Sequence, residues 1–253
     1  MIRKLSQEER RQELEDSRVQ GASLVTYMQP SSMVSEQLRN IRTNIKFAQV
    51  DSKARGQEEV KSIMVTSPGI GDGKSTISAN LAYLFTSNDQ DVLLVDTDLR
   101  KPLAHRIFGI PNKEGLSTLI SEEDKDPASC IRYIPSLNLH VLTSGPLPPN
   151  PEELLASERM AELMAYFEDK FSYVIYDVPP VLPVTDAQVL ASRVDGIILV
   201  AHEEVTQKND MKEAKKLLEI AKGNILGGVL NQVRPVEDSS YYGEYYYQTE
   251  GQA

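Results

Sequence analysis

Short apolar segments alternate with segments of helical periodicity through most of the chain. The apolar segments show little alternation with polar residues, which is typical of strands covered on both faces in a parallel sheet. The predicted strands are residues 62–67, 92–96, 139–144, 173–177, 196–202 and 225–231. Helices are predicted from the glycine-rich turn to Ser87, from Pro151, near 185–192 and over 206–221. This order predicts an α/β fold with a mostly parallel central sheet and helices on both faces.

The two ends of the chain differ in character from this central part. Residues 1–33 are polar and charged, with one short helix expected over 8–17, and we predict a flexible segment. Apolar positions at helical spacing then predict a helix over about 34–49. We place one domain at 34–236 and a flexible tail at 237–253, because the tail contains no Val, Leu, Ile or Met to anchor it.

Four residues indicate where the helix after the third strand begins. Asn150 is the predicted N-cap, and Pro151 suits the first helical position. Glu152 and Glu153 follow, where carboxylates stabilise the positive end of the helix dipole.

Composition narrows the range of functions. A chain of 253 residues with 40% hydrophobic residues can bury one substantial core. A net charge of -10 without a Lys/Arg block argues against nucleic-acid binding. The single cysteine, Cys130, cannot form an internal disulfide or a zinc site, so we expect a core or loop residue in a reducing compartment. The charged N-terminus resembles no signal peptide, and no apolar run reaches about 18 residues, so we expect a cytoplasmic protein.

A glycine-rich turn joins the first predicted strand to the helix that follows. Residues 67–76 read SPGIGDGKST. Gly69, Gly71 and Gly73 allow the backbone to wrap closely round phosphate oxygens, with successive N–H groups and the helix dipole facing the anion. The strand–turn–helix order therefore predicts a nucleotide phosphate site.

Side chains of the same turn supply the remaining phosphate and metal contacts. We expect Lys74 to bridge the β- and γ-phosphates of ATP and the Ser75 hydroxyl to bind Mg²⁺. Asp72 and Thr76 are included in the predicted nucleotide site. Pro68 stands where the common P-loop pattern has its first glycine. The alternative interpretation is a glycine-rich turn with an incidental lysine.

Two further predicted strands end in acidic residues: Asp96 and Asp98 follow one, and Asp177 ends the other. Because parallel strands end at the same edge of a sheet, these carboxylates should converge on the phosphate site. One or two of them can hold Mg²⁺, and one can orient or deprotonate an attacking hydroxyl. Each acid alone could equally be a helix cap or a solvated strand end.

Three motifs together resemble those of a known family. SPGIGDGKST, LLVDTDLRKP and VIYDVPP, the last followed by Thr185-Asp186-Ala187, are similar to the nucleotide motifs of the bacterial tyrosine kinases. These kinases are a branch of the deviant P-loop ATPases, which also include division-site and partition ATPases. The resemblance covers about residues 34–247 and implies a P-loop NTPase-like fold that uses ATP and Mg²⁺.

The resemblance also implies roles for individual residues. Asp96 would be the base for a tyrosine hydroxyl, and Asp98 and Asp177 would be Mg²⁺ partners, with Asp98 and Lys74 counted among the catalytic residues. Ser75 would bind the metal directly. The resemblance further implies that Asn231, at the end of the last predicted strand, contacts adenine; the alternative is a strand-end turn residue.

The kinase branch is favoured over the partition branch. Partition ATPases carry a lysine early in the phosphate loop that reaches a partner's nucleotide, and here that position is Gly69. Residues 99–102, LRKP, also resemble the kinases. The alternative function is a partition-type ATPase switch whose nucleotide state controls partner docking, with the tail as a recognition peptide.

Glu36, Arg39 and Arg42 stand three residues apart on the first long predicted helix. This spacing places them on one face, within reach of one another or of another subunit. The pattern resembles the motif through which these kinases assemble into rings, so we expect a homo-oligomer. An exposed, salt-bridged helix face is the alternative.

Five of the eleven tyrosines lie in the predicted tail: Tyr241, Tyr242, Tyr245, Tyr246 and Tyr247. Burial in a core does not explain aromatic residues in a polar, flexible segment. A flexible tether raises their concentration at a neighbouring active site, which favours autophosphorylation in trans. The alternatives are a recognition tail or a segment that orders on binding.

The resemblance also implies partners. Gram-positive members of the family work with a separate membrane-protein activator in capsule or exopolysaccharide export. We therefore expect such an activator, a location at the inner face of the cell membrane through that partner, and a cognate tyrosine phosphatase.

Overall fold

The computed structural model describes residues 23–54, 60–87 and 89–234, with side chains omitted for 48–54. The short helix expected over 8–17 and the predicted tail at 237–253 lie outside these residues. Within them, no helix is both long enough and apolar enough to cross a membrane.

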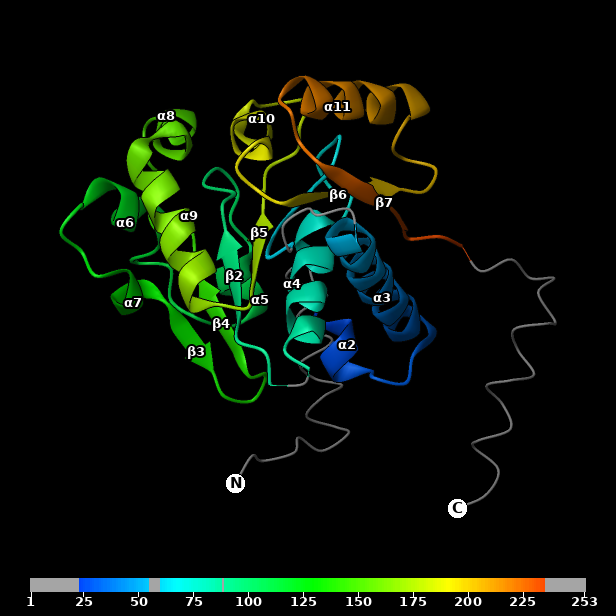
Figure 1. Cartoon of the computed structure of the whole chain (residues 1–253), viewed down its shortest axis with the longest axis horizontal. Coiled ribbons are helices and arrows are strands. Elements are labelled where there is room, and N and C mark those ends of the chain that lie inside the picture. Colours follow the sequence, from blue (N-terminus) through cyan, green and yellow to red (C-terminus); the bar gives the residue numbers. More distant parts are fainter. Residues whose placement is uncertain (1–22, 55–59, 88, 235–253) are drawn as a thin grey trace, which may run out of the picture.

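The centre of the molecule is a seven-stranded sheet of order β3-β4-β2-β5-β1-β6-β7 (Figure 1). Its strands are β1 Ser62–Thr66, β2 Val92–Asp96, β3 Arg132–Ile134, β4 Leu139–Leu142, β5 Tyr173–Asp177, β6 Gly196–His202 and β7 Ile225–Asn231. Neighbouring strands are parallel except β3 and β4, which are antiparallel. The six predicted strands and the mostly parallel α/β fold are confirmed. The sequence did not predict β3, because its three residues are too few for a periodic pattern.

Helices cover both faces of the sheet, as expected (Figure 1). One face carries α2 Val25–Met28, α3 Met33–Ala54, α4 Lys74–Phe85 and α5 Ala104–Ile107. The other carries α6 Leu116–Ser121, α7 Pro127–Cys130, α8 Pro151–Ala156, α9 Glu158–Lys170, α10 Asp186–Ala191 and α11 Lys208–Ile220. Successive strand residues point to opposite faces, so Ile63 and Val65 join one core while Met64 joins the other. Cys130 is a buried free thiol in the second core.

The helix predicted from Pro151 is two helices. It breaks at Ser157, whose hydroxyl accepts a 3.1 Å hydrogen bond from the N–H of Met160 and caps α9. Asn150 precedes α8, but its side chain does not cap the helix as predicted; its amide donates a 2.8 Å bond to Glu153 instead. The proline at the first position and the acidic first turn are confirmed.

Helix α2 lies inside the N-terminal segment that was expected to be flexible, and the sequence did not predict it. Its Thr26 and Met28 are buried, and Thr26 bonds to the side chain of Asn80 on α4. Helix α3 also runs past the expected end near residue 49.

The sheet register brings the predicted acids to one edge. Asp96 is paired in register with Asp177, and Val65, the penultimate residue of β1, also pairs with Asp177. The ends of β2, β5 and β1 therefore coincide, and the glycine-rich loop begins directly beside the acidic strand ends.

Candidate active site

The loop between β1 and α4 has a backbone that requires glycine at two positions. Gly71 has φ +89° and Gly73 has φ +96°, a region that other residues enter only with strain. A Cβ atom at Gly71 would meet nothing within 4 Å, whereas one at Gly73 would lie 2.0 Å from Nδ2 of Asn231. Conformation alone requires glycine at 71, while at 73 the close approach of Asn231 adds a second reason.

Asp72 fastens this loop from the inside. Its Oδ2 accepts a 2.9 Å bond from the N–H of Gly69, and its Oδ1 accepts a 2.7 Å bond from Oγ1 of Thr206. Its carbonyl oxygen accepts a 3.0 Å bond from Nδ2 of Asn231. The Asp72 carboxylate thus stabilises the shape of the phosphate loop. Thr206 connects this loop to the loop between β6 and α11, and Asn231 connects it to β7. Thr206 was not predicted as a site residue, because it belongs to no recognisable motif.

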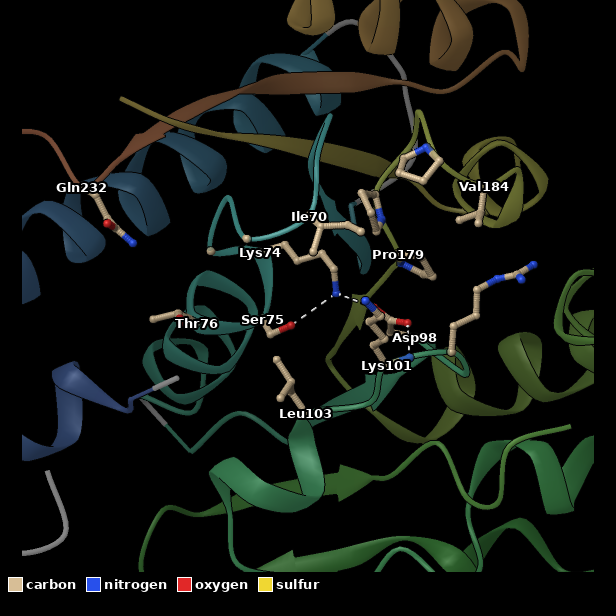
Figure 2. A pocket seen from close by; sticks show the side chains of 15 residues that line it. Ile70, Lys74, Ser75, Thr76, Asp98, Lys101, Leu103, Pro179, Val184 and Gln232 are labelled. Atoms are coloured by element: carbon tan, nitrogen blue, oxygen red, sulfur yellow. Dashed lines mark hydrogen bonds and ion pairs between the residues drawn. The ribbon is translucent and has the colours of Figure 1, made fainter. Parts of the chain in front are cut away.

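Lys74, the first residue of α4, lies between the predicted acids Asp98 and Asp177. Figure 2 shows its contacts with Asp98 and Ser75. Its Nζ is 2.8 Å from Oδ2 of Asp98, 3.5 Å from Oδ1 of Asp177 and 3.3 Å from Oγ of Ser75. Burial by itself lowers the pKa of Lys74, but the charges of Asp177 and Asp98 outweigh it and raise that pKa above its usual value. Lys74 is therefore a fixed positive charge at the mouth of the phosphate loop.

Asp96 is fully buried behind this pair of acids. Its Oδ2 accepts bonds from the N–H groups of Leu103 and Ala104, at 3.0 and 2.9 Å, and Oδ1 accepts a 3.2 Å bond from the N–H of Asp98. Burial, followed by the charge of Asp177, raises the pKa of Asp96 to about 7. A carboxyl group with this pKa can accept a proton near neutral pH.

Asp177 is also buried, which raises its pKa, although Lys74 opposes that change. Ser78, one turn into α4, places its hydroxyl 3.2 Å from Oδ1 of Asp177. Ser78 was not predicted, because a serine inside a helix carries no motif of its own.

The donor set at this edge fits Mg²⁺. Ser75, Asp98 and Asp177 offer a hydroxyl and two carboxylates, and Mg²⁺ prefers oxygen ligands. No group of three Asp, Glu, His or Cys side chains forms a metal cage in the part of the chain that the structure describes. Mg²⁺ is commonly held by one or two carboxylates together with substrate phosphates and water.

A cavity of about 370 Å³ opens beside Lys74, and its lining residues lie on both sides of that lysine. One end is lined by Thr76 and Gln232, next to Asn231. The other end has an apolar wall that includes Pro179, Pro183 and Val184, while Ile70 and Leu103 lie closer to Lys74. Figure 2 shows Thr76 and Gln232 on one side of Lys74 and Pro179 and Val184 on the other.

An ion pair borders the apolar end. Arg100 donates from Nε to Oδ2 of Asp186 at 2.8 Å and from a terminal nitrogen to Oδ1 at 3.1 Å. Both residues lie in motifs noted in the sequence, but no sequence pattern pairs residues so far apart along the chain.

The predicted oligomerisation motif lies on α3, away from this cavity. Glu36 and Arg39 form an ion pair with each other. Arg42 instead turns inward, donating to the carbonyl oxygen of Leu84 at 2.8 Å and to Oγ of Ser87 at 2.6 Å. Glu36 and Arg39 are thus paired with each other, whereas Arg42 contacts the end of α4 and Ser87 just beyond it. The five predicted tail tyrosines lie outside the described residues.

A glycine-rich loop that opens a helix, beside aspartates from adjacent parallel strand ends, defines a P-loop nucleotide-binding protein. The family model described as "CobQ/CobB/MinD/ParA nucleotide binding domain" matches residues 63–250. The chain is 41% identical over 224 residues to the putative tyrosine-protein kinase CapB of Staphylococcus aureus, covering 88% of this chain and 94% of CapB. It is 42% identical over 220 residues to the tyrosine-protein kinase YwqD of Bacillus subtilis (strain 168), covering 87% and 90%.

The solved structures agree with these sequence relatives. The crystal structure of the chimerical protein CapA2B2 matches with a TM-score of 0.77 and 38% identity, covering 88% of this chain and all of that one. The chain therefore belongs to the bacterial tyrosine kinases, within the MinD/ParA class of nucleotide-binding domains. The predicted family and fold are confirmed.

Proposed function

We propose that this protein is an ATP-dependent tyrosine autokinase that phosphorylates the tyrosines of a neighbouring subunit's tail. The observation that carries the proposal is the cluster of Lys74, Asp98 and Asp177 at the phosphate loop, with Asp96 buried beside it. Phosphoryl transfer to a hydroxyl requires a fixed cation, oxygen ligands for a metal and a carboxyl group able to accept a proton.

In the proposed reaction, the tyrosine oxygen forms a bond to the γ-phosphorus while the bond from that phosphorus to the β,γ-bridging oxygen breaks. ADP leaves, and the phenolic proton passes to Asp96. Backbone N–H groups around Gly71 and Gly73 hold the phosphates, and Lys74 neutralises charge on the transferred group. Mg²⁺, held by Ser75, Asp98 and Asp177, would supply further neutralisation of phosphate charge.

We also propose that the kinase regulates capsular or extracellular polysaccharide synthesis and export, together with a separate membrane-protein activator and a cognate phosphatase. The support is the similarity to CapB of Staphylococcus aureus and to the chimerical protein CapA2B2. Attachment to the inner face of the membrane would follow from binding the activator. The assembly would be a ring that uses Glu36, Arg39 and Arg42.

The activity is tested by replacing Lys74 with Met and incubating the purified full chain with ATP and Mg²⁺. We expect loss of phosphotyrosine with unchanged circular dichroism, because the substitution removes the phosphate contact without removing packing. The matched control is Lys125→Met, which breaks a surface pair of 2.8 Å with Glu114. Undiminished phosphotyrosine in the Lys74 variant would refute the site.

The acceptor is tested separately by changing the five tail tyrosines, 241, 242, 245, 246 and 247, to Phe. Most phosphotyrosine should disappear while ATP binding persists. Phosphate mapped by mass spectrometry to other positions would refute the tail as acceptor. Release of inorganic phosphate from wild type with no phosphotyrosine would instead support the ATPase switch as the function.

A further inference from the structure

The two ends of the cavity are chemically different, and phosphoryl transfer assigns them different occupants. In an in-line displacement the attacking oxygen lies opposite the leaving oxygen across the transferred phosphorus. Gln232 borders the end beyond Thr76, and its neighbour Asn231 contacts the phosphate loop at Asp72; we assign this end to the leaving ADP. The acceptor must then approach from the opposite side of Lys74, where Figure 2 shows Pro179 and Val184.

The acceptor side is walled by apolar groups. Pro179, Pro183 and Val184 line it, all from the segment between β5 and α10. An apolar wall offers no hydrogen bond or charge to a phosphate, whereas an aromatic ring that packs on it is stabilised by burial and dispersion contacts. The acceptor end thus suits a phenol ring.

Residues 179–184, the segment that builds this wall, are attached at their start to β1 and to the beginning of the phosphate loop. Oγ1 of Thr66 donates a 2.7 Å bond to the carbonyl of Pro179, and the N–H of Val181 donates a 2.8 Å bond to the carbonyl of Ser67. The far end of the segment, at Pro183 and Val184, leads into α10.

The far end is fastened by the pair of Arg100 and Asp186. Asp186 is the first residue of α10, and its side chain is 1% exposed, so its oxygens need hydrogen-bond partners within the protein. Arg100 meets it with two bonds, and 37% of the Arg100 side chain remains exposed along the cavity. Arg100 comes two residues after Asp98, so the pair joins the segment that carries Asp98 to the apolar wall.

We propose that the Arg100–Asp186 pair positions the acceptor tyrosine, because it holds the wall of Pro183 and Val184 at a set distance from Asp98. A phenol ring on that wall then presents its oxygen in line with the phosphoryl group. Both members of the pair are positioning residues that act through the wall. This inference rests on the proposed kinase function.

The test compares Arg100→Met, Arg100→Lys and Asp186→Asn in the full chain, with Lys125→Gln as a control at a surface ion pair. The acceptor is a synthetic peptide of residues 237–253, followed at saturating ATP and Mg²⁺. We expect kcat/KM for the peptide to fall on the order of tenfold or more in the Met and Asn variants. Arg100→Lys should retain part of it, and nucleotide affinity should stay at the wild-type value.

Asp186→Asn separates positioning from direct recognition. This variant leaves the Arg100 charge in place and frees it for the acidic peptide, so a contact between Arg100 and the peptide would leave kcat/KM unchanged or raise it. An unchanged or raised kcat/KM in Asp186→Asn overturns the inference. A loss of nucleotide affinity as large as the loss of kcat/KM in Arg100→Met and Asp186→Asn also overturns it. In both cases the kinase assignment stands. If wild type phosphorylates neither the peptide nor itself, the proposed kinase function is overturned, and this inference with it.

Discussion

At the scale of single residues, Asp96 shows what burial does to a carboxyl group at the site. Its carboxyl group is fully buried, and three backbone N–H groups hold it in place. Burial together with the charge of Asp177 raises the pKa from 3.8 to about 7, so the folded chain favours the protonated form. In the proposed reaction Asp96 must lose its proton to act as the base, and burial makes that loss costly.

This shift predicts a pH dependence of stability for the metal-free, nucleotide-free protein. Between pH 3.8 and about 7 the folded state binds more protons at Asp96 than the unfolded state does, so this group lowers the free energy of unfolding as pH rises through that window. Above about pH 7 its contribution is constant. Thermal unfolding of wild type and Asp96→Asn in EDTA measures it.

The Asn variant should lose part of the decline in melting temperature between pH 5 and 7, because its amide does not titrate. Parallel melting curves for the two proteins across this range would contradict the raised pKa. Comparing slopes with pH, rather than melting temperatures at one pH, cancels the change in hydrogen bonding that the amide causes.

At the scale of elements, α4 is the helix on which the site depends, and Asn80 connects it to α2. The side-chain oxygen of Asn80 accepts bonds from the N–H and Oγ1 of Thr26 at 2.9 and 2.8 Å. Its Nδ2 donates to the carbonyl oxygens of Ser23 and Thr76, both at 2.8 Å. Asn80 is fully buried, so each of these groups depends on it rather than on water.

We predict that Asn80→Ala lowers the free energy of unfolding by about 2–3 kcal/mol, because it leaves buried donors and acceptors unpaired. Urea unfolding measures the change. Asn40→Ala is the matched control: the same substitution at an exposed position of α3 should be near neutral, since alanine favours helix. Equal effects at the two positions would show that α2 contributes nothing through this contact.

At the scale of the whole molecule, charge and assembly are connected. The chain carries a net charge of -10, and each phosphotyrosine in the tail would add about -1.5 to -2. Subunits brought together in a ring would then repel one another more strongly. Phosphorylation should therefore loosen the proposed ring.

Light scattering checks this expectation. Wild type incubated with ATP and Mg²⁺ should show a lower mass than before incubation, and the variant with five tail tyrosines changed to Phe should show no change. Higher salt should reduce the difference, because exposed charges are screened over about 8 Å at physiological ionic strength. Identical masses for the phosphorylated and unphosphorylated wild type would refute the expectation.

Much of the fold could be predicted because each strand carries its own pattern. The bounds of β2, β5, β6 and β7 agree with their apolar segments, and the loop before Lys74 was recognisable because glycines must occupy its unusual backbone. Short elements such as β3 and α2 could not be found in this way. Their few residues are stabilised by neighbours that lie elsewhere in the chain, such as Asn80 for α2.

The sequence by itself determined the family, the strand order along the chain and the residue types at the phosphate loop, because these follow from local pattern and backbone requirement. Only the tertiary structure decided which side chains meet: Asp72 with Thr206, Arg100 with Asp186 and Lys74 between its two acids. It also decided the raised pKa of Asp96, since burial and neighbouring charge exist only after distant segments pack.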